Sequence, residues 1–261
     1  MKNFKFGENW ESFSKLIDNK KLEYSIISLQ KLTNRKNLKN MTFLDIGCGS
    51  GLSSLAAIKL NCKSLFAIDY DQQSVLTTKQ VLKNYKNKAK VKKLSVFDLN
   101  ERNKFDLVYS WGVLHHTGSM KKAIKKSSKM VDKNGYLIIS LYRKTYMCAF
   151  WKIEKIIYNN SPILFQKIIK KTFFYLIKLG LFLKKKNIDD YINDYEKKRG
   201  MNFFHDIHDW LGGYPYESIS VKETKNLLES LNFKLIRCFE AKQKVGLLGT
   251  GCDEYVFKRN N

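Results

Sequence analysis

Three glycines at alternate positions follow an acidic residue at the end of an apolar run. The acid is Asp45, and the glycines are Gly47, Gly49 and Gly51. The next residues, 52–58, have the pattern of a helix start. Glycine reaches positive φ without strain and lets the backbone come close to a ligand. A strand, a tight glycine turn and a helix therefore predict a site for a nucleotide-type ligand in an open α/β sheet.

Acids also end the next two predicted strands. Residues 63–68 predict a second strand, and Asp69 follows it. A carboxylate at this position can accept hydrogen bonds from both hydroxyls of a ribose. A third predicted strand, 91–97, ends in Asp98. Asp71 is interpreted instead as the N-cap of the helix that follows the second strand.

The fourth predicted strand, 105–110, runs into a segment that contains Trp111, His115 and His116. Ligand sites in open α/β sheets lie at the carboxyl ends of the strands. We therefore expect the residues that follow these four strands to converge at one edge. The alternative, a glycine turn without a ligand, is disfavoured because the later elements fall where such a site requires them.

The Asp-x-Gly-x-Gly-x-Gly spacing resembles motif I of class I S-adenosylmethionine-dependent methyltransferases. Segments 9–13, 110–118 and 209–217 are similar to a bacterial subfamily grouped loosely with the ubiquinone-pathway methylases. The resemblance implies an α/β fold: a Rossmann-like seven-stranded mixed sheet with helices on both faces, an antiparallel last strand and a helical cap inserted after strand 5. It also implies S-adenosyl-L-methionine as the cofactor and a small molecule as the methyl acceptor.

The resemblance further implies a set of cofactor-binding residues. In this class an acid such as Asp98 contacts the adenine amino group, Phe97 lies near the ring, and Tyr70 could pack on the adenine side. Cys48 is interpreted as a small filler of the glycine turn and not as a nucleophile. The implied set is Asp45, Gly47, Cys48, Gly49, Gly51, Asp69, Tyr70, Phe97, Asp98, Ser110 and Trp111.

All four histidines lie in the two segments that the resemblance places around the substrate. A hydroxyl acceptor needs a base to take its proton, and an imidazole with a pKa near 6.5 suits that task. We expect His116 to be the base, with His208 as the second candidate. His115 is equally consistent with a catalytic role and with a core or backbone-ordering role. His205 is the fourth histidine.

Four further residues are candidates for binding the substrate: Trp10, Asp209, Tyr214 and Glu217. Each has a structural alternative. Trp10 could pack against the sheet, Asp209 could cap a helix, and Tyr214 and Glu217 could serve only in loop packing.

The chain divides into four predicted segments. Residues 1–40 form an N-terminal helical segment over the cofactor site, 41–142 the cofactor-binding core, 143–216 a helical cap, and 217–261 a helix and strands that complete the core. Within the cap, 163–186 combines large apolar residues with lysines too frequent for a membrane-spanning helix. We favour a cap over the substrate pocket. Peripheral contact with an anionic membrane and a homodimer interface stay open.

The chain of 261 residues has 48 Lys plus Arg against 24 Asp plus Glu, a net charge of +24. Such a field attracts nucleic acid, anionic lipid or phosphorylated substrates. Nucleic-acid binding is disfavoured because lysine dominates, whereas specific phosphate and base recognition favours arginine. The five cysteines have no metal-ligand spacing, so no metal is expected. Free thiols and a polar N-terminus without a signal-like segment predict a cytoplasmic protein.

These observations predict methyl transfer from S-adenosylmethionine to a small-molecule hydroxyl, in a sugar, a surface-glycan precursor, or a phenolic or quinol compound. The Asn-Pro-Pro-Tyr motif of many amino-directed nucleic-acid methyltransferases is absent after the fourth strand. This absence argues against N-methylation of an adenine or glutamine type. One alternative is an RNA methyltransferase, motivated by the charge. The other is a non-catalytic protein, cofactor-binding or membrane-associated, that kept the fold.

Overall fold

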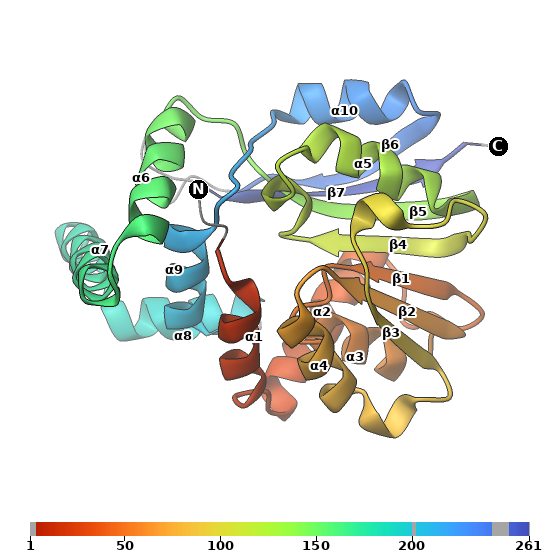
Figure 1. The fold of residues 1–261 in the computed structure, drawn as a ribbon, viewed down its shortest axis with the longest axis horizontal. Helices are drawn as coiled ribbons and strands as arrows, with labels where there is room; N and C mark the ends of the chain where they lie inside the picture. The colour runs from red at the N-terminus through yellow and green to blue at the C-terminus, as the bar shows by residue number, and fades with distance from the viewer. Residues whose placement is uncertain (1–3, 200–201, 242–250, 261) are drawn as a thin grey trace.

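The computed structural model describes residues 4–199, 202–241 and 251–260 and contains a seven-stranded mixed sheet (Figure 1). The strand order is β3-β2-β1-β4-β5-β7-β6, and β7 runs antiparallel to both of its neighbours. This confirms the predicted sheet with its antiparallel last strand. The strands are β1 Thr42–Ile46, β2 Ser64–Asp69, β3 Ala89–Lys93, β4 Phe105–Trp111, β5 Val131–Tyr142, β6 Phe233–Phe239 and β7 Cys252–Arg259.

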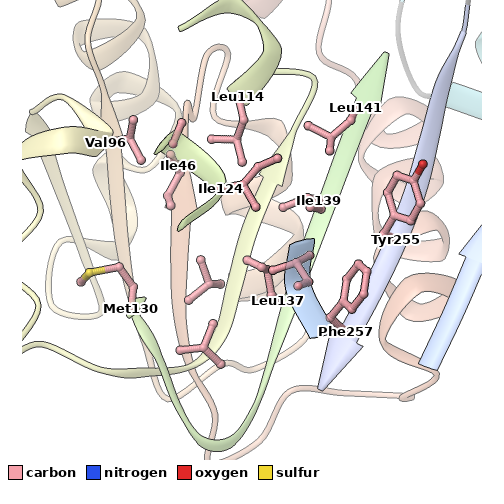
Figure 2. Close-up of a cluster of buried hydrophobic side chains, with 14 of the residues drawn as sticks. Ile46, Val96, Leu114, Ile124, Met130, Leu137, Ile139, Leu141, Tyr255 and Phe257 are labelled. Atoms are coloured by element: carbon pink, nitrogen blue, oxygen red, sulfur yellow. The ribbon is translucent and has the colours of Figure 1, made fainter. Parts of the chain in front are cut away.

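Helices pack on both faces of the sheet, which explains why the central strands bury apolar side chains on both of their sides. Along β5, Leu137, Ile139 and Leu141 face one hydrophobic core, and Ile138 faces the other. Figure 2 shows the first core, which contains side chains of β5 and β7 together with Ile124 of α5. The helices of the two faces are α2 Asn19–Thr33, α3 Leu52–Lys59, α4 Gln72–Val81, α5 Met120–Lys129 and α10 Val221–Glu229.

Side-chain caps fix the starts of three of these helices, and at the start of α2 the Asp18 carboxylate accepts a hydrogen bond from the Lys21 N–H. The Asp71 carboxylate accepts hydrogen bonds from the backbone N–H groups of Gln73 and Ser74, which confirms its predicted role as the N-cap of α4. Ser220 and Glu223 form a capping box at the start of α10. Such caps satisfy backbone donors that have no partner within the helix.

The third strand is shorter than the sequence pattern predicts. We expected a strand over 91–97, but β3 ends at Lys93, and a 3₁₀ turn covers Val96–Asp98. The Ser95 hydroxyl accepts a hydrogen bond from the Phe97 N–H. Such local side-chain bonds compete with the ladder of a sheet, and β3 is an edge strand with one neighbour only. Asp98 is therefore exposed in a turn and does not end a strand.

Four helices follow β5 and lie within the predicted insertion 143–216. They stand to one side of the sheet, and α9 contacts the N-terminal helix α1 Phe6–Ser14 (Figure 1). They share a hydrophobic core of their own around Tyr158, Phe203 and Leu211. We call these four helices the cap: α6 Cys148–Asn160, α7 Ile163–Leu183, α8 Ile188–Arg199 and α9 Phe203–Gly212. Within the described ranges, no helix combines the length and apolarity needed to cross a membrane.

Candidate functional site

A cavity of about 1190 Å³ connects the sheet edge with the cap. At one end it is lined by the glycine turn after β1 and by Asp69 at the end of β2. At the other end it is lined by residues of α6, α7 and α9. The volume exceeds the several hundred cubic ångströms of an ordinary small-molecule pocket, so there is room for two ligands.

The turn after β1 has a conformation that its glycines permit. Gly47, Gly49 and Gly51 have φ angles of +78°, +52° and +80°. The N–H groups of Gly47 and Cys48 both donate to the Ile68 carbonyl, at 2.8 and 3.0 Å, which ties the turn to the end of β2. A Cβ at Gly47 would lie 2.4 Å from the Val113 side chain. The turn therefore needs glycine for both its backbone angles and its packing.

Two carboxylates stand at this end of the cavity. Asp69 accepts hydrogen bonds from the N–H groups of Gly49 at 3.0 Å and Asp71 at 2.9 Å, and burial raises its pKa to about 6. Asp45 accepts a 2.6 Å hydrogen bond from the Ser54 hydroxyl. Burial raises the pKa of Asp45 to about 7, and the nearby Asp69 charge also raises it. Within the part of the chain that the structure describes, no cation acts on either carboxylate. Buried carboxylates of this kind favour a ligand that brings positive charge and hydroxyl donors, and S-adenosylmethionine has both.

Helix α1 lies across the glycine turn. The Trp10 ring would be 3.4 Å from a Cβ at Gly49, so indole and turn are in close contact. The Asn9 amide donates a 2.7 Å hydrogen bond to the carboxylate of Asp209 in α9. Helix α1 thus links the sheet edge to the cap, and Trp10 and Asp209 both line the cavity.

Several residues of the implied cofactor set do not line the cavity. Tyr70 and Phe97 are 76% and 39% exposed, and Asp98 is exposed as well. Ser110 is fully buried, and its hydroxyl donates to the Ile46 carbonyl between β1 and β4. Gly51 serves as the N-cap of α3.

Cys48 and Trp111 do line the cavity. Burial raises the pKa of the Cys48 thiol, so the thiol stays protonated. Its sulfur accepts a hydrogen bond from Thr78, as suits a packed side chain. The Trp111 indole N–H donates to Glu254 at 2.8 Å.

Two of the four histidines, His115 and His116, line the cavity. His116 Nδ1 lies 2.7 Å from the Pro215 carbonyl, and because a carbonyl only accepts, this nitrogen holds the proton and Nε2 is left as the acceptor. Burial lowers the pKa of His116 to about 4. His115 is fully buried, and its Nδ1 accepts a hydrogen bond from the Tyr142 N–H. Burial lowers its pKa too, so both rings are neutral at pH 7.

The other two histidines lie outside the cavity lining. His208 Nδ1 is 2.7 Å from the Tyr158 hydroxyl, and burial lowers its pKa to about 4. His205 contacts the side chains of Asn202 and Ser12. The second predicted candidate for the base therefore does not line the cavity and contacts Tyr158 of the cap.

Of the predicted substrate-binding residues, Trp10 and Asp209 line the cavity, and the other two do not. Asp209 lies inside α9, whose N-cap is Asn202, so its alternative role as a cap is wrong. Glu217 and Tyr214 do not line the cavity. The Glu217 carboxylate accepts a 2.7 Å hydrogen bond from the Met120 N–H at the start of α5. Its own N–H donates to the His115 carbonyl, so Glu217 holds the histidine segment in place.

The cap contains a buried ion pair that the candidate residues of the sequence do not include. Lys155 Nζ lies 3.7 Å from a carboxylate oxygen of Glu154, and the two side chains are 0% and 17% exposed. Among the described residues, neither Lys155 Nζ nor the Glu154 carboxylate has a hydrogen-bond partner. Burial raises the pKa of Glu154 to about 7 and lowers that of Lys155 to about 8. The ammonium lies 4.1 Å from the centre of the Trp210 ring.

The spacing of aromatic residues around Lys155 in the sequence indicates that this lysine is buried. Trp151, Lys155 and Tyr158 recur at spacings of four and three residues, which places them on one face of a helix. The aromatic members are buried at 8% and 0% exposure. A lysine between two large aromatic residues on the same face therefore indicates a buried charge.

The methyltransferase domain family matches residues 37–201 of the chain, more than half of its length. The chain belongs to this family, and it is a class I S-adenosylmethionine-dependent methyltransferase. The resemblance stated from the sequence, including its cofactor, is thereby confirmed.

Curated relatives match parts of the chain. The ubiquinone biosynthesis O-methyltransferase of Pelagibacter ubique (strain HTCC1062) is 36% identical over 110 residues, 42% of this chain and 45% of that protein. The enzyme of the same name from Rickettsia akari (strain Hartford) is 31% identical over 127 residues, 48% of this chain and 49% of that protein. The matches thus span about half the length of these relatives.

Solved structures share the fold over most of the chain. The N-methyltransferase NodS of Bradyrhizobium japonicum, in complex with S-adenosylhomocysteine, has a TM-score of 0.56 at 14% identity and covers 99% of this chain and 100% of its own. Magnesium protoporphyrin IX methyltransferase from Synechocystis, also with S-adenosylhomocysteine, has a TM-score of 0.56 at 16% identity, with 92% and 83% covered.

Proposed function

We propose that this protein methylates a hydroxyl group of a small, partly apolar acceptor, of the phenolic or quinol class. The observation that carries the proposal is the cavity that joins the glycine turn to an apolar, aromatic wall in the cap. The similarity to ubiquinone biosynthesis O-methyltransferases supports the same acceptor class and the oxygen as the methylated atom.

The sheet edge suits the cofactor, which supplies a methyl group on a positively charged sulfur. The Asp69 carboxylate has one backbone donor on each oxygen, and each oxygen keeps lone pairs free for ribose hydroxyls. The glycine turn lets the backbone approach without side chains. Trp10 packs on Gly49 and covers the turn at this end.

The cap suits a planar acceptor. Phe173 and Trp210 stack with ring centres 4.9 Å apart, and Trp151 meets Trp210 edge-on at 4.6 Å. All three rings line the cavity. Aromatic walls bind planar rings by offset or edge-to-face contacts, and they bury apolar area at the same time. A strongly polar sugar has fewer partners on this wall, which is why we favour the phenolic or quinol class.

A hydroxyl acceptor must lose its proton, and two side chains are candidates for accepting it. His116 presents a neutral imidazole with Nε2 as its acceptor. Glu154 is also among the lining residues, with both of its carboxylate oxygens buried, and burial raises the pKa of this carboxylate to about 7. A base works best when its pKa lies near the working pH, so Glu154 competes with His116, which we keep as the first candidate.

The test is transfer of a labelled methyl group from S-adenosylmethionine to a panel of acceptors. The panel contains alkylcatechols of increasing chain length, a nucleotide sugar and total RNA. We expect label in the catechols, with transfer that improves as the chain lengthens. Label in RNA alone would overturn the proposal in favour of an RNA methyltransferase. Cofactor binding without transfer to any acceptor would favour the non-catalytic alternative.

Variants of the two candidate bases identify the proton acceptor. If His116 takes the proton, His116→Ala lowers kcat by about a hundredfold or more and Glu154→Gln changes it little. The reverse result assigns the role to Glu154. His208→Ala is the matched control, since this ring lies outside the cavity lining. Equal turnover in all three variants would mean that neither side chain is the base.

A further inference from the structure

Helix α7 exposes a continuous apolar row. Phe165, Ile168, Leu176, Leu179 and Leu183 recur at spacings of three, four or eight residues, which places them on one side of the helix. Their exposed fractions run from 52% to 74%. Helix α6 adds a second row on the same pattern: Phe150, Ile153 and Ile157 are 54%, 58% and 57% exposed. We call the two rows the α6–α7 face.

A row of lysines borders the apolar row of α7. Lys167, Lys171 and Lys178 are all exposed, and their spacings of four and seven residues place them along one line of the helix. Residues 163–186 contain seven lysines and no acidic residue. An apolar face beside a lysine row is the pattern of a helix that lies in the plane of an anionic membrane surface.

The cavity opens at this face. Ile168, Leu176, Leu179 and Leu183 are more than half exposed, and the same four residues line the cavity. Phe150 of α6 also belongs to both sets. An apolar surface at the mouth of a cavity is a marker of an interaction site.

We propose that the α6–α7 face docks onto an anionic lipid bilayer, with α7 lying along the surface and the cavity mouth facing the lipid. The charge of the chain favours an anionic bilayer over a second copy of the chain as the partner of this face. Each copy has a net charge of +24, and a symmetric contact through α7 would bring two lysine rows together. An anionic surface attracts the same lysines and accepts the apolar row.

The test is co-flotation of the full-length protein with phosphatidylcholine vesicles, with and without phosphatidylserine. We expect binding to the anionic vesicles only. The variant Lys167→Gln/Lys171→Gln/Lys178→Gln should lose on the order of a hundredfold in affinity for them. The matched control is Lys121→Gln/Lys122→Gln/Lys125→Gln, which removes the same charge from the exposed side of α5. We expect the control to lose less than about threefold.

A second variant tests insertion of the apolar row. Phe165→Ser/Phe182→Ser changes Phe165 of the row and Phe182, a further exposed apolar residue of α7, neither of which lines the cavity, and we expect weaker vesicle binding that added salt does not mask. If the α5 control lost as much affinity for the vesicles as the α7 lysine variant, net charge alone would determine binding, and the proposal would be overturned. A dimer that becomes a monomer in the α7 variants would show that a second copy covers the face.

The docking proposal is independent of the proposed function. Each variant is also titrated with S-adenosylhomocysteine, and we expect unchanged affinity because none of the varied side chains lines the cavity. Unchanged cofactor binding without vesicle binding rejects docking and leaves the proposed function standing. Vesicle binding by a protein that does not bind the cofactor supports docking and rejects the proposed function.

Discussion

The two ends of the cavity are built in different ways. At the sheet edge, the glycine turn and Asp69 are fixed by backbone hydrogen bonds between neighbouring strands. In the cap, large apolar side chains line the wall, and the buried pair of Glu154 and Lys155 has no hydrogen-bond partner within the described residues. The first end suits a ligand of fixed shape, and the second suits an acceptor that brings its own polar group. The comparison suggests that cofactor binding and acceptor binding can be changed separately.

Breaking the buried pair has the largest expected effect on stability. Glu154→Gln leaves the Lys155 ammonium buried without a carboxylate, and we expect a loss of about 3 kcal/mol in the free energy of unfolding, measured in urea. The double variant Glu154→Gln/Lys155→Met should recover most of that loss, because no buried charge is left.

Lys152→Met is the control for that prediction. Lys152 is exposed on the same helix, so its replacement should change the free energy of unfolding by less than about 0.5 kcal/mol. A Glu154→Gln variant as stable as the wild-type protein would contradict the view that Glu154 compensates the buried charge of Lys155.

The sheet edge predicts a pH dependence of cofactor binding. In the free protein the pKa of Asp69 is raised to about 6 and that of Asp45 to about 7. A ligand that brings hydroxyl donors and positive charge favours the ionised carboxylates. Affinity is therefore close to full at pH 8 and is lost as the pH falls through these values. We expect affinity for S-adenosylmethionine at least about tenfold lower at pH 5 than at pH 8, which is the loss that a group with the pKa of Asp69 gives alone.

The variant Asp69→Asn separates the two carboxylates. It removes the group that titrates near pH 6, so the remaining pH dependence should be smaller and should follow Asp45 alone. Titration calorimetry across the pH range measures both proteins. An affinity of the wild-type protein that does not change between pH 8 and pH 5 would show that these carboxylates do not meet the ligand.

Glycines at the two ends should respond to alanine with opposite signs. Gly112, after β4, has a φ of +74° and open space where a Cβ would stand, so Gly112→Ala should cost about 1 kcal/mol through backbone strain alone. Gly180 lies within α7, also with open space, so Gly180→Ala should stabilise by about 0.5–1 kcal/mol. Urea unfolding measures both. If both variants changed the free energy of unfolding in the same direction, this contrast would be contradicted.

The sheet and its glycine turn could be predicted because local signals specify them. Asp45 and Asp69 lie in the last two residues of the apolar strands β1 and β2, and glycines supply the positive φ angles of the turn. Side chains whose roles depend on distant partners could not be predicted. Glu217 caps a helix that lies far from it in sequence, and His208 is held by Tyr158 of another helix. The burial of Lys155 depends on Trp210, which only the packing of α6 against α9 brings near it.

The central claim is that the glycine turn and Asp69 hold S-adenosylmethionine. The most direct test is calorimetric titration of the wild-type protein and the Asp69→Ala variant with S-adenosylmethionine and S-adenosylhomocysteine, with Asp132→Ala as an exposed-acid control. We predict micromolar binding by the wild type and the control, and a loss on the order of a hundredfold in the Asp69 variant, since two charge-assisted hydrogen bonds disappear. No binding by the wild type, or equal binding by the Asp69 variant, would contradict the account.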